Sequence, residues 1–283
     1  MRGAKVCEGA RCEVRGAKVE AVVSGGPKRG DDAKRDPLGG SAWSDARMVE
    51  GFVQSPPNSS LMEFASRALG CDGSLLDIGC GAGRNALPLA RSGWRVAGSD
   101  LSRAMLAAAA RRVEQEALPN RIDLVMAAME SLPFQSKSFD FIVAHGIWNL
   151  ARSGDEFRTA LREAARVARP DAPLFVFTFS RHTIAESARP IAGESFVFTD
   201  FSGAPQCFLT HDQLTAELAE AGFVSDPTYP LRELNRPTGD LRTKGAPVIY
   251  EGVFRRSAGA RTTTRAVLPI CRLISHLDWK VAL

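Results

Sequence analysis

A glycine-rich turn between a short apolar run and a helical segment is the part of the sequence best suited to hold a cofactor. It reads Leu75-Leu76-Asp77-Ile78-Gly79-Cys80-Gly81-Ala82-Gly83-Arg84. Its three glycines lack a β-carbon, so the backbone can turn tightly and a ligand can lie directly against it. Asp100 ends the next apolar run, where its carboxylate is placed to accept hydrogen bonds from two ribose hydroxyls. Together these residues predict a cofactor that contains a nucleoside.

The spacing of the glycines separates two kinds of cofactor. A dinucleotide fingerprint has its third glycine at the position that Arg84 occupies in this chain. Asp77 stands two residues before the first glycine, where a carboxylate would repel a pyrophosphate and attract an ammonium group. The turn therefore favours a cofactor with a ribose and a cationic amino group over a nicotinamide dinucleotide.

Two histidines follow predicted strands and are candidate proton acceptors. His145 begins the segment His145-Gly146-Ile147-Trp148-Asn149 after the fourth strand, and His182 follows the fifth strand. An imidazole titrates near neutrality, so either ring could take a proton from a substrate. The alternative for His145 is packing against the cofactor or the backbone without proton transfer. His211 falls on the first turn of a helix, where we expect a surface residue.

Short apolar runs alternate with amphipathic segments along the chain. Strands are predicted at 75–78, 95–98, 122–126, 139–144 and 174–179, and helices at 85–91, 102–117 and 155–168. This alternation predicts a doubly wound α/β sheet, because parallel neighbours need crossover connections. Ligands of such sheets bind at the carboxyl ends of the strands, where the glycine-rich turn and both histidines fall. Two later strands, near 225–229 and 248–254, are expected to pair antiparallel at the sheet edge.

Composition divides the chain into three parts. Residues 1–40 are rich in Gly, Lys, Arg and Asp and repeat the sequence Arg-Gly-Ala-Lys-Val, which predicts a disordered basic extension. Residues 41–256 form the folded domain, and residues 257–283 form a tail of undetermined role. An insertion at about 190–209 carries Phe196, Phe198, Phe201 and Phe208. These rings either line an apolar pocket for a substrate or form the core of a lid.

Composition also excludes several classes of protein. The chain has 283 residues, of which 45% are hydrophobic and 24% charged, as in ordinary globular proteins. No apolar stretch approaches the roughly 20 residues that a membrane span requires. Each end carries a net charge of +3, which leaves the domain at −2 and disfavours nucleic-acid binding. The six cysteines form no CxxC pair, so we expect no metal site and free thiols in a reducing cytoplasm.

The sequence resembles the class I S-adenosylmethionine-dependent methyltransferases, particularly the small-molecule subgroup called type 11. The resemblance covers about residues 43–256 and is carried by the segments 75–84, 96–102, 130–134, 138–140, 163–167 and 209–223. It implies a Rossmann-like, seven-stranded, mostly parallel sheet with the last strand antiparallel. It also implies a cytoplasmic enzyme that transfers a methyl group from S-adenosylmethionine to a small-molecule acceptor by in-line displacement.

The resemblance also implies roles for individual residues. The methionine part of the cofactor would be surrounded by Asp77, Gly79, Cys80, Gly81 and Gly83. Asp100 would bind the ribose, Leu101 the adenine face, the turn Met129-Glu130 the adenine edge, and His145 would contact the cofactor or act as a base. Many members of the family carry an aspartate where this chain has Ala128. The hydrogen bond to the adenine amino group must therefore come from the backbone or from Glu130.

Two other functions compete with methyl transfer. One is a methyltransferase-like binding or regulatory module that has lost turnover. The intact Asp77, glycines and Asp100 argue for retained cofactor binding, and turnover stays open. The other is a nicotinamide oxidoreductase, which the glycine spacing and the lack of a Tyr-x-x-x-Lys pair disfavour. Nucleic-acid methylation is disfavoured because no Asn/Asp-Pro-Pro-Tyr/Phe motif follows the fourth strand. The segment 145–149 has a likeness to quinone-biosynthesis methyltransferases, but the acceptor and the oligomeric state stay open.

Overall fold

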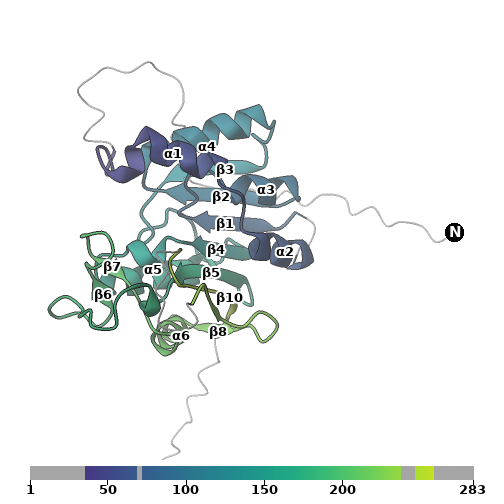
Figure 1. The fold of residues 1–283 in the computed structure, drawn as a ribbon. Helices are drawn as coiled ribbons and strands as arrows, with labels where there is room; N and C mark the ends of the chain where they lie inside the picture. The colour runs from purple at the N-terminus through teal and green to yellow at the C-terminus, as the bar shows by residue number, and fades with distance from the viewer. Residues whose placement is uncertain (1–35, 69–71, 237–245, 258–283) are drawn as a thin grey trace, which may run out of the picture.

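A central β-sheet organises the computed structural model, which describes residues 36–68, 72–236 and 246–257 (Figure 1). The strand order is β3-β2-β1-β4-β5-β10-β8, and β9 also pairs with β10. The strands are β1 (Ser74–Ile78), β2 (Arg95–Asp100), β3 (Ile122–Met126), β4 (Phe141–His145), β5 (Pro173–Phe179), β8 (Phe223–Ser225), β9 (Arg232–Leu234) and β10 (Ile249–Arg256). Strands β1 to β5 are parallel, and β10 runs antiparallel to β5. The predicted sheet of seven strands with the last one antiparallel is confirmed, and β9 is added to it.

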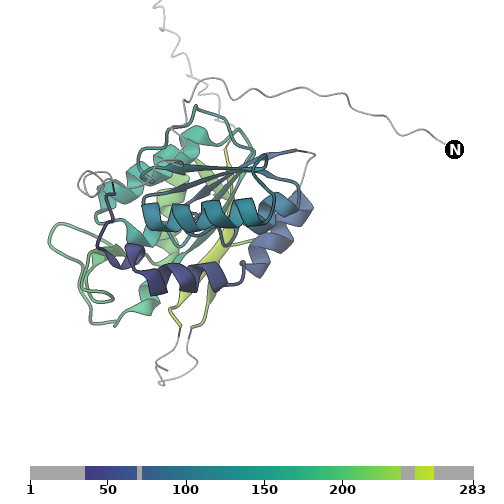
Figure 2. The ribbon, with the colours of Figure 1, turned by 90° about the horizontal axis from the view of Figure 1, so that it is seen from above.

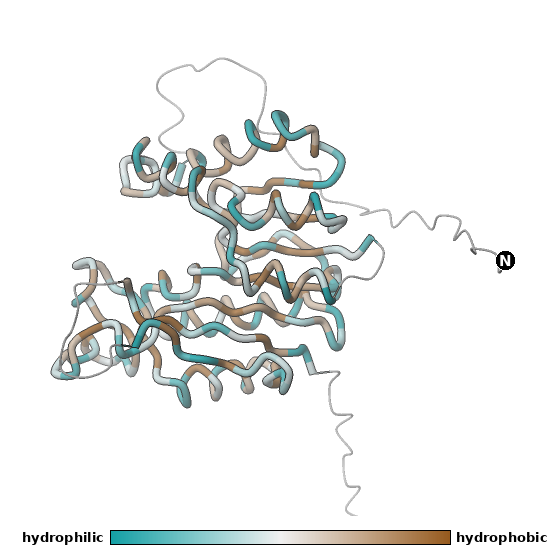
Figure 3. The backbone as a smooth tube through the Cα atoms, turned by 45° about the vertical axis from the view of Figure 1, so that its right-hand side comes forward, coloured by the Kyte–Doolittle hydropathy of each residue, from teal (hydrophilic) through white to brown (hydrophobic). Residues whose placement is uncertain are grey.

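Helices cover both faces of the sheet (Figure 2). They are α1 (Ala46–Gln54), α2 (Ser59–Ala68), α3 (Ala86–Arg91), α4 (Arg103–Gln115), α5 (Gly154–Val167) and α6 (His211–Glu220). One buried core joins α5 and α6 to the sheet, and a second joins α2 and α3 to its other face. Brown, hydrophobic stretches correspondingly run along the central strands in Figure 3. Among the described residues, no helix is long and apolar enough to cross a membrane.

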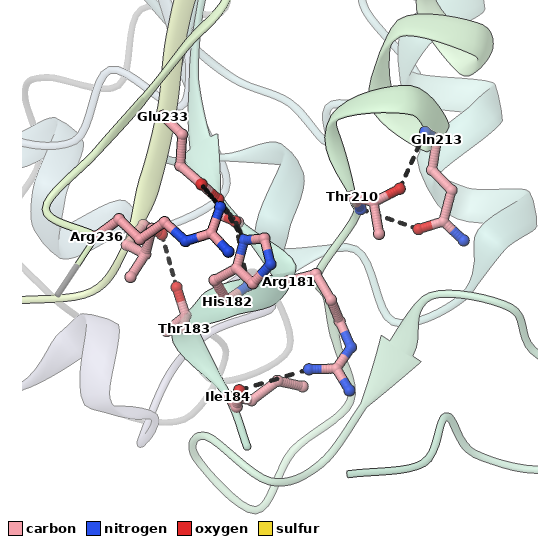
Figure 4. A network of polar contacts seen from close by, with 10 residues as sticks. Arg181, His182, Thr183, Ile184, Thr210, Gln213, Glu233 and Arg236 are labelled. Carbon is pink, nitrogen blue, oxygen red and sulfur yellow. Dashed lines mark hydrogen bonds and ion pairs between the residues drawn. The ribbon is translucent and has the colours of Figure 1, made fainter. Parts of the chain in front are cut away.

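Local sequence signals place the ends of these helices. The Ser102 hydroxyl accepts a hydrogen bond from the Met105 amide at 3.3 Å, which caps α4 as predicted. Thr210 and Gln213 form a reciprocal capping box at the start of α6 (Figure 4). Gly93 and Gly222 follow α3 and α6 with φ values of +110° and +84°, a left-handed conformation that ends a helix and favours glycine.

One predicted strand is displaced along the chain. Strand β8 covers Phe223–Ser225 and pairs antiparallel with β10, whereas the residues at 226–229, predicted as strand, form a turn. The Asp226 carboxylate accepts a hydrogen bond from the Thr228 amide at 2.8 Å, which closes a local turn. Pro227 has no amide hydrogen to give to a sheet. The segment Ser-Asp-Pro-Thr-Tyr at 225–229 therefore leaves the sheet after its first residue and forms a turn.

The segment before β1 packs over the glycine-rich turn. Trp43, Val49, Phe52 and Val53 contact a small buried cluster formed by Ala82, Met105 and Ala108. The Ser102 hydroxyl donates a hydrogen bond to the Trp43 carbonyl at 2.9 Å. Residues 36–40, the end of the predicted extension, form a turn; the rest of that extension and nearly all of the predicted tail lie outside the described residues.

The insertion at 190–209 has its own small core. It contains the two-stranded sheet β6 (Val197–Phe198) and β7 (Gln206–Cys207). Phe196, Phe198 and Phe208 are all buried, as the lid-core alternative requires. Phe201 is 47% exposed and contacts Phe179 at a ring separation of 5.3 Å. Of the four rings, this one is available to a ligand.

Candidate functional site

The glycine-rich turn has the backbone that its glycines predict. Gly79, Gly81 and Gly83 have φ values of +71°, +53° and +78°. A β-carbon on Gly79 would lie 2.7 Å from Cβ of Ile147, and one on Gly83 would lie 2.2 Å from the terminal Cδ1 of Leu87, so a side chain at either position requires its neighbour to move. At Gly81 the nearest atom to such a carbon is on Phe52 at 3.7 Å. The turn is thus packed tightly against the protein on either side of Gly81 and has more room at Gly81 itself.

Asp100 connects the end of β2 to this turn. One carboxylate oxygen accepts a hydrogen bond from the Gly81 amide at 2.9 Å, and the other accepts one from the Ser102 amide at 2.8 Å. Burial raises the pKa of Asp100, although these backbone hydrogen bonds act in the opposite direction. Each carboxylate oxygen can accept two hydrogen bonds, so both keep capacity for a ribose hydroxyl. Asp100 is therefore fixed in place and still able to bind a ligand.

Asp77 is the most unusual charged group of the site. Its side chain lies at the end of β1 and is 1% exposed, and its Oδ2 has no hydrogen-bond partner among the described residues. Burial raises the pKa of Asp77 to about 7. The positive charge of Arg84 lowers this pKa, and the negative charge of Asp100 raises it by a smaller amount. A buried carboxylate oxygen without a partner is costly unless a ligand satisfies it. An ammonium group such as that of S-adenosylmethionine fits this position.

Arg84 and His145 form a contact that the sequence motifs did not indicate. The Arg84 guanidinium lies 3.0 Å from both ring nitrogens of His145, and the ring stacks on Phe177 at 4.0 Å. Burial, followed by the positive charge of Arg84, lowers the pKa of His145 to about 3. A base with so low a pKa is a poor proton acceptor at neutral pH. The structure therefore favours the packing alternative, and the predicted catalytic role of His145 stays a prediction.

Asn58 and Glu251 extend this contact across the sheet. The Asn58 side-chain amide lies 3.3 Å from Nε2 of His145 and donates a hydrogen bond to Glu251 at 2.7 Å. In the sheet register His145 is opposite Phe177, which is opposite Glu251. Sequence reasoning missed Arg84, Asn58 and Glu251. Only the position of Arg84 beside the third glycine gave a local signal; the other two lie far from the turn in the chain.

The remaining predicted cofactor residues lie on turns around the same edge of the sheet. Cys80 turns its thiol toward β2, where a β-carbon on Gly98 would lie 2.9 Å from the sulfur, and burial raises the pKa of this thiol. Leu101 is half-buried at the turn between β2 and α4. Met129 is buried in the core on the α5 side, whereas the neighbouring Glu130 is half-buried. Any contact of Cys80 or Met129 with a cofactor would therefore involve the backbone.

Trp148 and the other histidines have clear positions. Trp148 is 1% exposed and packs against Phe157 in the core. His182 lies in a short 3-10 helix after β5, with Nδ1 2.6 Å from a carboxylate oxygen of Glu233 (Figure 4). His211 is exposed on the first turn of α6, as predicted. A cavity of about 480 Å³ lies away from these residues, at the amino ends of the parallel strands. The residues that line it include Gly73, Trp94 and Arg255.

The pKa of His145 leads to a testable expectation for stability. Because its pKa is lower in the folded protein than the ordinary value of about 6.5, the unfolded chain binds the extra proton, and stability falls as the pH drops from 6.5 toward 3. Between pH 7 and pH 5 we expect the free energy of unfolding of His145→Gln to fall by about 1 to 2 kcal/mol less than that of the wild type, as measured by urea unfolding. His211→Gln, at an exposed position, is the control. Equal acid sensitivity of all three proteins would contradict a neutral imidazole at position 145.

Comparisons with known proteins agree with this geometry. Residues 76–176 match the profile of a family described as "Methyltransferase domain". The methyltransferase GfsG of Streptomyces halstedii is 29% identical over 70% of this chain and 69% of its own length. A ubiquinone/menaquinone biosynthesis C-methyltransferase of Dinoroseobacter shibae is 41% identical, but over 29% of this chain and 32% of its own length.

A solved structure of a SAM-dependent methyltransferase from Methanosarcina mazei has the same fold. Its TM-score is 0.58 at 22% identity, and the match covers 72% of this chain and 99% of that protein. The matched profile begins within β1 and ends within β5, so it spans the glycine-rich turn, Asp77, Asp100 and His145. These comparisons show that residues 76–176 carry a methyltransferase domain and that the chain has the fold of an S-adenosylmethionine-dependent methyltransferase.

Proposed function

We propose that this protein transfers the methyl group of S-adenosylmethionine to a small-molecule acceptor. The observation that carries the proposal is the buried Oδ2 of Asp77, which has no partner among the described residues and lies beside the glycine-rich turn. An ammonium group placed there would satisfy the oxygen and stabilise the ionised carboxylate. A pyrophosphate would be repelled by the same charge. The cofactor type thus follows from this one side chain.

We assign the other residues of the site by the chemistry of their groups. Arg84 carries a positive charge next to Asp77 and is suited to the carboxylate at the methionine end of the cofactor. Gly79, Gly81 and Gly83 let the backbone approach the ligand, and Asp100 is suited to the ribose hydroxyls. Leu101 and the turn at Met129 and Glu130 would contact the adenine. The segment of α1 that carries Phe52 covers the turn and would exclude water.

Methyl transfer makes modest chemical demands on the protein. When bound, the cofactor supplies an electrophilic methyl group on a positively charged sulfur. The chain's own task is to hold an acceptor in line with that methyl group and to keep water away from it. Three side chains lie beside the methionine end of the proposed site and would form the wall of the acceptor site: His145, Phe177 and Asn58. In this arrangement His145 stays neutral and positions the acceptor.

A planar, largely apolar acceptor fits the aromatic side chains near the site. His145 stacks on Phe177, and Phe179, two residues further along β5, contacts the exposed Phe201. These rings offer flat apolar surfaces at the carboxyl ends of β4 and β5. The relative from Dinoroseobacter shibae is named for C-methylation in quinone biosynthesis, which also involves a ring substrate. We therefore extend the proposal to an aromatic acceptor.

Thermal unfolding with S-adenosylhomocysteine tests the cofactor part of the proposal. Ligand at a hundred times its dissociation constant should stabilise the folded protein by about 2.7 kcal/mol, or roughly 5 to 10 °C. Asp100→Ala removes the proposed ribose acceptor, so this shift should be lost. The exposed Asp123→Ala serves as the matched control and should keep it. A shift with NADH alone would contradict the proposal, and binding without turnover of any acceptor would indicate a binding module.

A further inference from the structure

A carboxylate and a histidine form a close pair at the end of β5, outside the proposed cofactor site. Nδ1 of His182 lies 2.6 Å from Oε1 of Glu233 (Figure 4). The His182 side chain is 43% exposed, whereas that of Glu233 is only 16% exposed. Among the described residues, Nε2 of His182 has no hydrogen-bond partner. One ring nitrogen is therefore held by a carboxylate, and the other, on a side chain that is nearly half exposed, has no protein partner in the described part of the chain.

The surrounding residues fix Glu233 rather than leave it as a surface ion pair. The buried Ser180 hydroxyl donates a hydrogen bond to Glu233, and Arg236 donates another at 3.2 Å. Burial alone would raise the pKa of Glu233, but the hydrogen bonds from Ser180 and His182 outweigh burial and hold that pKa below its usual range. The Tyr250 hydroxyl, on β10, also contacts Ser180 and Glu233. A carboxylate fixed in this way selects the tautomer of its histidine partner with the proton on Nδ1.

The turn that carries His182 is fixed as well. The His182 amide donates a hydrogen bond to the Ser180 hydroxyl at 3.1 Å, and the Thr183 hydroxyl donates one to the Val248 carbonyl at 2.6 Å (Figure 4). Ser180 itself is fully buried and lies on the Glu233 side of the ring. It is therefore not placed as a nucleophile activated by Nε2, which excludes a hydrolase triad at this position.

The pair lies at the edge of the sheet where the acceptor is expected. His182 follows β5. In the sheet β4 lies between β5 and β1, so β5 is two strand spacings, roughly 10 Å, from β1. Phe177 and Phe179 lie along β5 in this interval, and the exposed Phe201 contacts Phe179. An acceptor of one or two rings could lie on these side chains and extend from the methionine end of the cofactor site to His182.

We propose that His182, oriented by Glu233, is a general base that takes a proton from an O–H group of a phenolic methyl acceptor. This rests on the proposed function. The acceptor O–H bond breaks and its proton moves to Nε2 of His182, giving an imidazolium that Glu233 stabilises. The electron pair left on the phenolate oxygen forms the bond to the methyl carbon. Where a conjugated ring carbon takes the methyl group instead, that carbon then loses its hydrogen to solvent as a proton, which restores the aromatic ring. The bond between carbon and sulfur breaks with its electrons on sulfur, and the imidazolium returns its proton to solvent.

The test uses phenols of graded acidity as acceptors, from 4-nitrophenol to 4-methoxyphenol, together with 1,4-naphthalenediol, at pH 8 with S-adenosylmethionine. For the weakly acidic phenols we expect His182→Gln to lower kcat by about 10²- to 10⁴-fold with little change in KM. For 4-nitrophenol, which is already ionised at this pH, the loss should be small. In Glu233→Gln the loss of kcat should depend on the acidity of the phenol in the same way but should be smaller. His211→Gln, at an exposed histidine, is the control and should match the wild type.

Several outcomes would overturn this proposal without touching the cofactor assignment. One is equal loss of rate for all phenols in His182→Gln, which indicates a structural role. Another is a wild-type protein that binds S-adenosylhomocysteine but methylates none of the phenols. A third is a nitrogen-15 NMR spectrum at pH 8 that shows the proton of the neutral His182 ring on Nε2. Failure of the wild type to bind S-adenosylhomocysteine would instead contradict the proposed function. A retained thermal shift with this ligand shows that each variant is folded.

Discussion

Asp77→Asn is expected to weaken binding of S-adenosylhomocysteine by about a hundredfold, because it removes the charge that faces the ligand's ammonium group while keeping the shape of the side chain. The buried Oδ2 of Asp77 has no other partner among the described residues, so no neighbouring group is left unpaired by the change. Isothermal titration calorimetry measures the loss directly. Asp123→Asn makes the same substitution at an exposed position of β3 and should bind as the wild type does.

The same variant should be more stable than the wild type when no ligand is present. The pKa of Asp77 is about 7 in the folded protein and about 4 in the unfolded chain, so the folded state binds more protons between these values. Stability is therefore lost as the pH rises from 4 to 7, by up to about 4 kcal/mol. Asp77→Asn removes this loss, and we expect it to be more stable by about 2 to 4 kcal/mol at pH 8 and similar at pH 4.

Binding and stability should thus move in opposite directions in one variant. In the wild type, affinity for S-adenosylhomocysteine should also fall as the pH drops below about 7, nearly tenfold per pH unit, because the ligand requires the ionised carboxylate. Asp77→Asn should lose this dependence. A variant that is destabilised at pH 8, or that binds the ligand normally, would show that the buried carboxylate is a structural group and would contradict its assignment to the cofactor.

Gly83→Ala is expected to destabilise the protein by about 3 kcal/mol, or roughly 6 to 12 °C in Tm. Two effects add at this position. The φ of +78° is unfavourable for any residue with a β-carbon, by about 1 to 2 kcal/mol. The new carbon would also lie 2.2 Å from Cδ1 of the buried Leu87, and overpacking of a core typically costs about 1 to 3 kcal/mol. Urea unfolding measures the sum.

A second glycine separates these two effects. Gly193 has nearly the same φ, +84°, but a β-carbon there meets no atom within 4 Å. Gly193→Ala should therefore show the conformational part alone, about 1 to 2 kcal/mol. If both variants lose the same stability, the close approach of Leu87 to the turn does not matter. The turn would then need glycine for its backbone angles only.

The sequence by itself determined the parts of the protein that depend on local preferences. Strands β1 to β5 and β10, the helix ends at Ser102, Gly93 and Gly222, and the glycine-rich turn follow from side-chain periodicity and from conformations that few residue types adopt. Asp77 and Asp100 could be predicted to lie close together because Asp100 ends β2 and Asp77 is the last residue but one of β1, and neighbouring parallel strands end at the same edge of a sheet. The turn after β8 shows the limit, because there Pro227 and the hydrogen bond to the Asp226 side chain replace the predicted strand by a turn.

Only the tertiary structure decided the properties that arise from burial and from residues distant in sequence. Arg84 and Asn58 converge on His145, and burial together with the charge of Arg84 leaves its ring neutral at pH 7. Glu233 reaches His182 because β9 pairs with β10, which in turn pairs with β5. The pKa of a side chain depends on the groups packed around it, and long-range strand pairing leaves no periodic signal near the residues it unites. For that reason the sequence identified the glycine-rich turn, while the fold assembled the surroundings of His145 and His182.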